Sequence, residues 1–238
     1  PLIHGADGAK LSKRHGALGV EAYRDDGFLP EAVFNYLLRL GWSHGDDEII
    51  SREQAVEWFD LGDVGKSAAR FDTDKLTSLN GHYIRHGDNE RLSKFILPVI
   101  TEKLGGRVAE GTEIWLNKGL DDLKERAKTI IELADSALFY AKTRPLTMDE
   151  KATTLLSEDG IEKLCLLHAA LADIDDWSAD RLKQSVGDLA EAQDLKLGKL
   201  LQPLRAALTG THVSPGMFDV MAVLGREESL GRLDDVLN

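Results

Sequence analysis

A short basic loop near the start of the sequence has the residue types best suited to binding phosphate. Lys10, Lys13 and Arg14 place three cations within five residues, and Gly8 and Gly16 give the surrounding backbone freedom to turn. Ammonium and guanidinium donors on such a loop could bind a polyphosphate. A basic cluster of this length can also be a plain solvated surface, and the residue types alone leave both interpretations open. Only nine residues precede Lys10, so any partner residues are expected elsewhere in the chain.

Three other motifs resemble chemical sites but have simpler interpretations. Gly65-Lys66-Ser67 matches the end of a phosphate-binding P-loop, yet Asp60 stands where that motif requires its first glycine. His82 and His86 could share one face of a helix, but a third metal ligand at suitable spacing is not apparent, so no metal site is expected. Cys165 lies in an apolar run and is expected in the core rather than as a nucleophile.

The bulk composition is that of an ordinary globular protein. Hydrophobic residues make up 42% and charged residues 29% of the 238 residues, and no apolar run approaches the ~20 residues that would span a bilayer. A single cysteine excludes an intrachain disulfide, and the first residues lack the features of a signal peptide. We therefore expect a cytoplasmic protein with no membrane segment.

The net charge of −12 bears on which partners the chain can bind. With 29 basic and 41 acidic residues, the chain is not expected to bind nucleic acids indiscriminately. Salt confines the reach of each charge to roughly 8 Å, so a local basic strip can still bind phosphates on an acidic protein. Specific nucleic-acid binding therefore stays open.

The elements that must position the basic loop and the other candidate residues are predicted to be helices. In residues 30–41, Pro30 suits a first helical position and the apolar residues repeat with helical spacing. Capping boxes are predicted at Ser51 with Gln54 and at Thr147 with Glu150. Residues 88–104 also have a helical period, which Pro98 is expected to kink or interrupt. Further helices are predicted near 110–118, 120–141, 147–156, 158–172, 178–192, 199–208, 215–224 and 226–237.

The order of several motifs closely resembles bacterial glutamyl-tRNA synthetase. The resemblance begins with Lys10-Leu11-Ser12-Lys13-Arg14-His15-Gly16-Ala17 and continues through Gly27-Phe28-Leu29-Pro30-Glu31-Ala32 and Leu40-Gly41-Trp42-Ser43. It includes Phe71-Asp72 and Leu79-Asn80-Gly81-His82-Tyr83-Ile84-Arg85, and then Gly198-Lys199-Leu200-Leu201-Gln202-Pro203-Leu204-Arg205 with Ser214-Pro215-Gly216. It covers nearly the whole chain and is weakest around 86–118 and 146–190.

The resemblance implies an all-α fold: a stem-contact helical region followed by a helical anticodon-binding cage. The implied divisions are 1–17, a KMSKS-type loop at the end of a catalytic domain; 18–80, the stem-contact region; and 81–145 and 146–238, two anticodon-binding subdomains. The family's other signature, a His-Ile-Gly-His-type sequence, is absent from this sequence. We therefore expect the C-terminal half of such an enzyme, unable to form glutamyl-adenylate alone.

The same resemblance assigns residues to substrates. Lys13 is the implied catalytic residue that contacts ATP phosphate, and Lys10, Leu11, Ser12 and Arg14 complete the ATP-binding loop, with Mg²⁺ accompanying ATP in the full-length enzyme.

For the RNA, Arg126 matches an arginine placed near the anticodon in this family. Lys124 and Lys128 could contact phosphates or lie on a solvated helix surface. The implied partners are tRNA(Glu) and possibly tRNA(Gln), with ATP and glutamate in the complete enzyme, acting as a monomer. The alternatives are a stand-alone anticodon-binding module and a helical protein-interaction module, both without catalysis.

Overall fold

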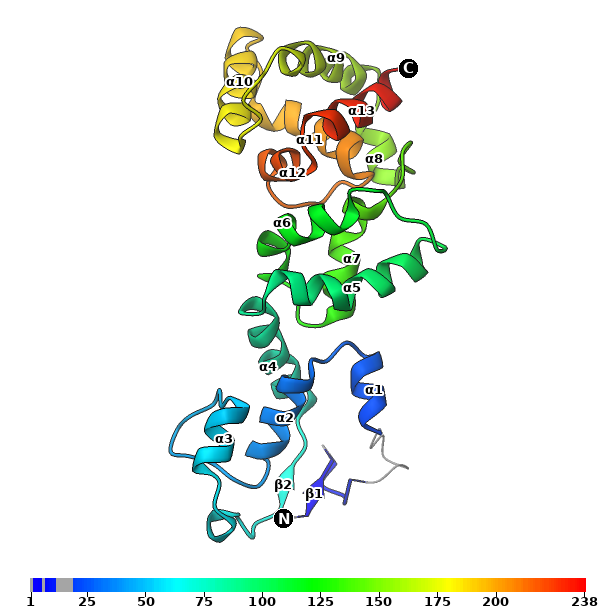
Figure 1. The fold of residues 1–238 in the computed structure, drawn as a ribbon. Helices are drawn as coiled ribbons and strands as arrows, with labels where there is room; N and C mark the ends of the chain where they lie inside the picture. Colours follow the sequence, from blue (N-terminus) through cyan, green and yellow to red (C-terminus); the bar gives the residue numbers. More distant parts are fainter. Residues whose placement is uncertain (1, 6, 12–18) are drawn as a thin grey trace. The chain divides into compact units, whose positions relative to one another are not determined.

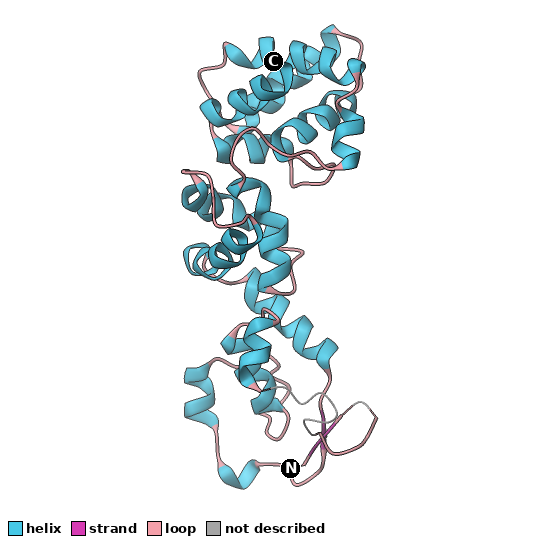
Figure 2. Cartoon of the chain, turned by 90° about the vertical axis from the view of Figure 1, so that its right-hand side faces the viewer, coloured by secondary structure: helices cyan, strands magenta, loops and turns pink. Residues whose placement is uncertain are grey.

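The structure, a computed structural model, describes residues 2–5, 7–11 and 19–238, and its regular secondary structure is almost entirely helical (Figures 1 and 2). This confirms the predicted all-α class. The strands in the described part are two residues long, β1 (Ile3–His4) and β2 (Ala69–Arg70), and they pair in parallel. Among the described residues, no helix has the length and apolar character to cross a membrane.

The chain folds into two compact units. Unit 1 comprises Pro1–Ile96 with Lys124–Leu133, and unit 2 comprises Leu97–Leu123 with Ala134–Asn238. The helices of unit 1 are α1 (Val20–Asp25), α2 (Pro30–Arg39), α3 (Arg52–Trp58) and α4 (Thr73–Arg85), with a 3₁₀ turn at Leu61–Asp63. Helix α5 (Asn89–Lys103) passes from unit 1 into unit 2. The finer division at residues 17, 80 and 145 stays a prediction.

Local sequence signals start the helices of unit 1. Pro30 lies at the start of α2, as predicted, where its missing N–H costs nothing. The predicted capping box of α3 is confirmed, because the Gln54 N–H donates to Ser51 Oγ at 3.1 Å and the Ser51 N–H donates to Gln54 Oε1 at 2.9 Å. Asp72 caps α4 by accepting from the N–H groups of Asp74 and Lys75.

The core of unit 1 forms where α2 packs against α4. Val33, Tyr36 and Leu76 are buried together. The Asp72 N–H donates to the Tyr36 hydroxyl oxygen at 2.6 Å, which ties the start of α4 to the middle of α2. Each aliphatic side chain buried there contributes about 1.5–3 kcal/mol. The packing therefore fixes α2 and α4 as one scaffold.

Unit 2 is a bundle of short helices. It contains most of α6 (Thr112–Lys124) and α7 (Ile130–Ala141), together with α8 (Glu150–Leu155), α9 (Glu158–Ala172), α10 (Ala179–Ala192), α11 (Leu197–Thr209), α12 (Met217–Leu224) and α13 (Arg226–Leu237). Helices α9 and α11 lie at its centre, and Leu164, Leu167 and Leu204 on them are fully buried. Arg232 of α13 is also fully buried.

Three local predictions were wrong. The cap of α8 is Asp149, whose Oδ1 accepts from the Ala152 N–H at 2.6 Å, and not Thr147; aspartate is the stronger capping residue. Residues 125–129 form a turn between α6 and α7, inside the helix predicted for 120–141. Cys165 is exposed on α9 rather than in the core.

Helix α5 continues through Pro98 without interruption. A proline inside a helix costs about 3 kcal/mol because it removes one backbone hydrogen bond and crowds the preceding turn. Leu92, Ile96 and Ile100 on the same helix are fully buried, and each contributes about 1.5–3 kcal/mol. Burial of this apolar face therefore outweighs the cost of the proline.

Candidate nucleic-acid interface

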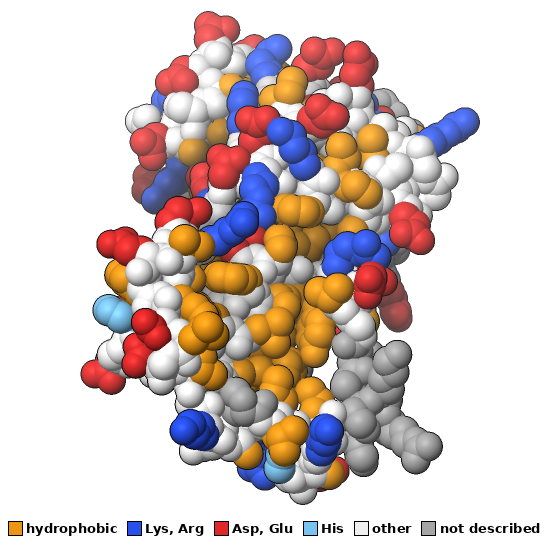
Figure 3. Space-filling model, turned by 60° about the horizontal axis from the view of Figure 1, so that its bottom comes forward, with side chains coloured by type: hydrophobic (Ala, Val, Ile, Leu, Met, Phe, Trp, Pro, Cys, Tyr) orange, Lys and Arg blue, Asp and Glu red, His pale blue; other side chains and the backbone are white. Residues whose placement is uncertain are grey.

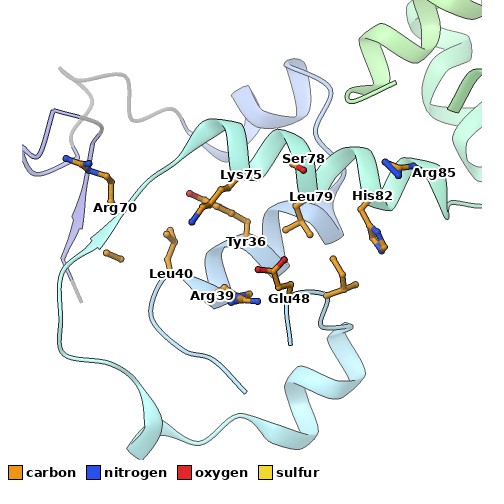
Figure 4. Close-up of a pocket in the computed structure, with 12 residues that line it drawn as sticks. Tyr36, Arg39, Leu40, Glu48, Arg70, Lys75, Ser78, Leu79, His82 and Arg85 are labelled. Atoms are coloured by element: carbon orange, nitrogen blue, oxygen red, sulfur yellow. The ribbon is translucent and has the colours of Figure 1, made fainter. Parts of the chain in front are cut away.

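A cleft of about 720 Å³ lies in unit 1 between α4, the end of α2, strand β2 and the segment at residues 48–49 (Figure 4). Its floor is partly apolar, formed by Tyr36, Leu40, Ile49 and Leu79. The basic residues that line it are Arg39, Arg70, Lys75, His82 and Arg85. One carboxylate, that of Glu48, is among the lining residues.

The spacing of residues along α4 explains why one face is basic. Lys75, Leu79 and His82 are three or four residues apart and project into the cleft together (Figure 4). Leu76 and Ile84, on another face of the helix, are fully buried. One helix thus packs against the core of unit 1 and presents a cationic row to the cleft.

Asn35 and Arg39 of α2 shape the opposite wall. The buried Asn35 amide donates to the Glu48 carbonyl at 2.8 Å, and its Oδ1 accepts from the Ile50 N–H at 2.8 Å. The Arg39 guanidinium donates to the carbonyl of Asp47. These bonds fix the segment that carries Glu48 and Ile49 against α2, so the wall is preorganised.

Three of the cations of the cleft lack counter-ions among the described residues. Arg39, Arg70 and Lys75 form no ion pair with any residue that the structure describes. Arg85 pairs only loosely with Glu125, its Nε lying 3.8 Å from Oε2, and both side chains are exposed. On a chain of net charge −12, unpaired cations gathered in one cleft form a local site for anions such as phosphates.

The second large cleft has the opposite charge. It lies in unit 2, has a volume of about 460 Å³, and is lined by Trp115, Arg144 and the carboxylates of Glu110, Glu227 and Glu228. Arg144 is already paired with Asp235, its Nε lying 2.7 Å from Oδ2. Phosphate would be repelled there, so the cleft in unit 1 is the better candidate for a nucleic-acid backbone.

His82 and His86 lie at the C-terminal end of the cationic row. Their ring centroids are 4.2 Å apart, and His86 Nδ1 is 2.9 Å from the His82 carbonyl oxygen. Burial, together with His86 and Arg85, lowers the pKa of His82 below its usual value. Within the described part of the chain, no group of three potential metal ligands occurs, at this pair or elsewhere.

The turn at residues 125–129 contains the predicted RNA-binding arginine. Arg126 is exposed and forms no hydrogen bond or ion pair with a described residue. Lys128 is also exposed. Lys124 is half-buried, and its Nζ donates to Asn89 Oδ1 at 2.9 Å and to the Gly87 carbonyl at 3.3 Å. A phosphate contact by Lys124 would therefore compete with existing hydrogen bonds, whereas Arg126 and Lys128 have no such competition.

Asn80 of α4 holds this turn in place. Its amide nitrogen donates to the Lys128 carbonyl at 2.7 Å and to the Gly27 carbonyl at 3.3 Å, and its Oδ1 accepts from the Leu29 N–H at 2.7 Å. The Ile130 N–H donates to the same Gly27 carbonyl at 2.9 Å. These bonds hold the turn that contains Arg126 against α4 in unit 1, the unit that also contains the basic cleft.

The predicted phosphate loop is described only at its start. Lys10 is exposed, and the Leu11 N–H donates to the Ile3 carbonyl at 2.8 Å, which closes a small hairpin next to β2. Arg70 lies on β2, the strand that pairs with this hairpin, and its Nη2 lies near Gly8. Ser12, Lys13 and Arg14 lie outside the described residues. Gly65-Lys66-Ser67 leads into β2 and not into a helix, so it is no P-loop.

Unit 2 contains a half-buried guanidinium that also lacks a carboxylate partner among the described residues. Arg205 of α11 donates from Nε to Ser214 Oγ at 2.9 Å. Burial lowers the pKa of this guanidinium, which still stays charged at neutral pH. Arg205 is thus a second candidate contact for an anion.

Sequence reasoning missed the cleft. Lys75, His82 and Arg85 share a helical face, and that spacing was the available signal. Arg39 and Arg70 come from different elements, and only the packing of α2 on α4 brings them to the same cleft.

Comparison with known proteins places these features in a family. Residues 1–78 match the family model "tRNA synthetases class I (E and Q), catalytic domain", and residues 90–237 match "Anticodon binding domain". The chain is 59% identical over 238 residues to glutamate–tRNA ligase 2 of Paramagnetospirillum magneticum and 60% identical to that of Rhizorhabdus wittichii. In both comparisons the match covers 100% of this chain and 50% of the relative.

Solved structures agree with the sequence comparison. A glutamate tRNA ligase from Elizabethkingia meningosepticum, in complex with its amino acid, matches with a TM-score of 0.79 and 30% identity over 99% of this chain and 50% of that one. Glutamate-tRNA synthetase from Elizabethkingia anophelis matches with a TM-score of 0.75 and 29% identity. The chain spans about half the length of the curated relatives it matches. It therefore belongs to the anticodon binding domain family, in the form that glutamate–tRNA ligases carry.

Proposed function

We propose that this chain is the tRNA-binding part of a glutamate–tRNA ligase, which joins glutamate to tRNA(Glu) through a glutamyl-adenylate made from ATP. The observation that carries the proposal is the similarity to such ligases over the full length of the chain, at 59–60% identity. The basic cleft supports it, because RNA backbone binding needs a cationic surface on an acidic protein. The protein acts as a monomer in the cytoplasm.

Within this proposal the loop at residues 10–14 and the turn at residues 125–129 bind different ligands. The loop of Lys10, Leu11, Ser12, Lys13 and Arg14 binds the phosphates of ATP, and Lys13 stabilises the charge that builds up on the departing pyrophosphate. Arg126 and Lys128 contact the RNA near the anticodon, with Lys124 as a further phosphate contact. Mg²⁺ would accompany ATP, and the described residues offer no cluster of three ligands to hold it.

The distribution of exposed apolar residues supports a larger ligase over a free-standing module. Of the twelve large hydrophobic residues that are exposed among the described residues, eight lie within residues 2–61, in the segment that matches the catalytic-domain family. They are Leu2, Val20, Phe34, Leu37, Ile49, Val56, Phe59 and Leu61. Hydrophobic side chains also gather on the face shown in Figure 3. Apolar surface of this kind usually marks an interface, so unit 1 is suited to pack against further protein.

Titration with tRNA tests the proposal directly. Labelled tRNA(Glu) should bind the chain in the presence of Mg²⁺, and replacement of its anticodon by an unrelated one should weaken binding. A parallel titration with tRNA(Gln) shows whether this chain distinguishes the two. Equal affinity for all anticodons would refute the anticodon-reading part of the proposal, and the absence of any tRNA binding would refute the proposal as a whole.

Lys75→Ala is expected to reduce the salt dependence of tRNA binding. A lysine that contacts one phosphate releases about one counterion, so the slope of log affinity against log salt should fall by roughly one unit in magnitude. Fluorescence anisotropy at four salt concentrations measures this slope. Lys183→Ala is the matched control, because Lys183 is an exposed lysine of α10 in unit 2. A slope that is unchanged in Lys75→Ala would show that the cleft does not bind the backbone.

A further inference from the structure

We infer that His82 is a further RNA-binding group of the basic cleft and that it binds a phosphate in its protonated form, which makes RNA affinity depend on pH. This inference rests on the proposed tRNA-binding function. It concerns a residue to which neither the sequence patterns nor the comparisons assign a role. Its basis is the position of His82 in the cleft and the charges around it.

His82 is placed to contact a ligand that enters the cleft. It is half-buried on α4 and lines the cleft together with Lys75 and Arg85 (Figure 4). His86, the residue that follows α4, lies against it with its Nδ1 2.9 Å from the His82 carbonyl oxygen. His86 thus has a backbone partner, whereas no hydrogen bond to the ring nitrogens of His82 occurs among the described residues. The His82 ring nitrogens can therefore donate to a ligand.

The charges that line the cleft with His82 are mostly positive. They come from α2 (Arg39), from β2 (Arg70) and from α4 itself (Lys75, Arg85 and the neighbouring His86), with Tyr36 also in the lining. Glu48 is the carboxylate of the cleft, and Glu125 partly offsets Arg85 at 3.8 Å. In the free protein burial, and after it the neighbouring His86 and Arg85, lower the pKa of His82 and disfavour its protonated form.

A bound phosphate reverses this balance. Its negative charge neutralises the neighbouring cations and attracts the imidazolium, so the pKa of His82 rises on binding. Because the bound state then takes up a proton, protonation of His82 favours RNA binding. The gain in affinity is complete at pH values below the pKa of the free protein and is lost as the pH rises through the pKa of the complex.

Three variants of the chain test the inference, with tRNA(Glu) titrated between pH 5.5 and 8 at constant salt and constant Mg²⁺. For the unmodified chain, affinity should fall about threefold to tenfold from pH 5.5 to 8, since a rise of one pKa unit corresponds to a tenfold change. His82→Gln should lose this pH-dependent factor. His82→Arg, which keeps a positive charge at all pH values, should retain tight binding at pH 8.

His168→Gln is the matched control. His168 lies in unit 2, where its Nε2 is 2.9 Å from Asp234 Oδ1, so the change removes a titrating imidazole away from the cleft. It should leave the pH dependence of the unmodified chain intact. Protonation of the RNA itself affects all variants equally and cancels between them.

The outcomes separate this inference from the proposed function. If tRNA binds but His82→Gln keeps the full pH dependence, His82 is not the titrating ligand and the inference is overturned, while the tRNA-binding function stands. Weaker binding of His82→Arg at pH 8 than of His82→Gln would also overturn it, because a fixed cation should help. If tRNA binds none of the variants at any pH, the proposed function itself fails.

Discussion

Arg232→Ala is expected to lower the free energy of unfolding of unit 2 by about 3–5 kcal/mol, because it breaks a buried ion pair from one side. The Arg232 side chain is fully buried, and its Nε donates to Glu228 Oε1 at 2.7 Å. Its Nη1 donates to the carbonyls of Phe139 at 3.0 Å and Leu208 at 2.6 Å. One guanidinium therefore joins α13 to the ends of α7 and α11. Alanine would leave Glu228 and both carbonyls without these partners.

Urea unfolding of the variant, followed by circular dichroism and by tryptophan fluorescence, measures the loss. Arg226→Ala is the matched control, since Arg226 is an exposed arginine of the same helix that donates to one carbonyl, that of Ala172. It should cost less than about 1 kcal/mol. Replacing both partners, Arg232→Met with Glu228→Leu, should restore part of the stability, because no charge is then left unpaired. A single Arg232→Ala variant as stable as the unmodified chain would contradict the bridging role.

Asn80→Ala is expected to cost about 3–5 kcal/mol of the stability of unit 1. Asn80 is fully buried, and its side chain makes three hydrogen bonds to the backbone at Gly27, Leu29 and Lys128. Each buried backbone group that loses its partner costs about 1–3 kcal/mol. Asn80→Asp should not rescue the loss, since a carboxylate cannot donate to the Gly27 and Lys128 carbonyls.

Asn80→Ala is also expected to affect tRNA binding. Because Asn80 holds the turn that contains Arg126, its loss should weaken discrimination among anticodons in the tRNA titration even below the unfolding temperature. Asn238→Ala is the matched control, because the Asn238 amide makes its one hydrogen bond at the exposed C-terminal end. A stability loss below 1 kcal/mol for Asn80→Ala, or intact anticodon discrimination, would show that the turn is held by other contacts.

Signals that act within one helix turn were readable from the sequence. The helical period of residues 30–41, Pro30 and the Ser51 capping box were all predicted and are all present. They depend on residues three or four apart, which interact in any helical context. The all-α class follows from the repetition of such signals along the chain.

Features that depend on residues far apart in the sequence could not be predicted from it. The break at residues 125–129 is held by Asn80 and Gly27, which are far away in the sequence. Lys124 donates a hydrogen bond to Asn89, and no local pattern joins the two residues. The cleft needs Arg39 from α2 and Arg70 from β2 next to α4. Tertiary packing determines the break, the Lys124 hydrogen bond and the cleft, and the pattern of a single sequence does not show which distant residues pack together.

Helix α4 also fixes a distance within unit 1. It begins directly after β2, which pairs with the hairpin that ends at Lys10 and Leu11, and near its other end Asn80 holds the turn with Arg126. Its 13 residues, rising ~1.5 Å each, give a stiff rod of about 20 Å. The β1–β2 pair and the turn with Arg126 are thus held at a fixed separation by one element, so the two ends of unit 1 are mechanically coupled through α4.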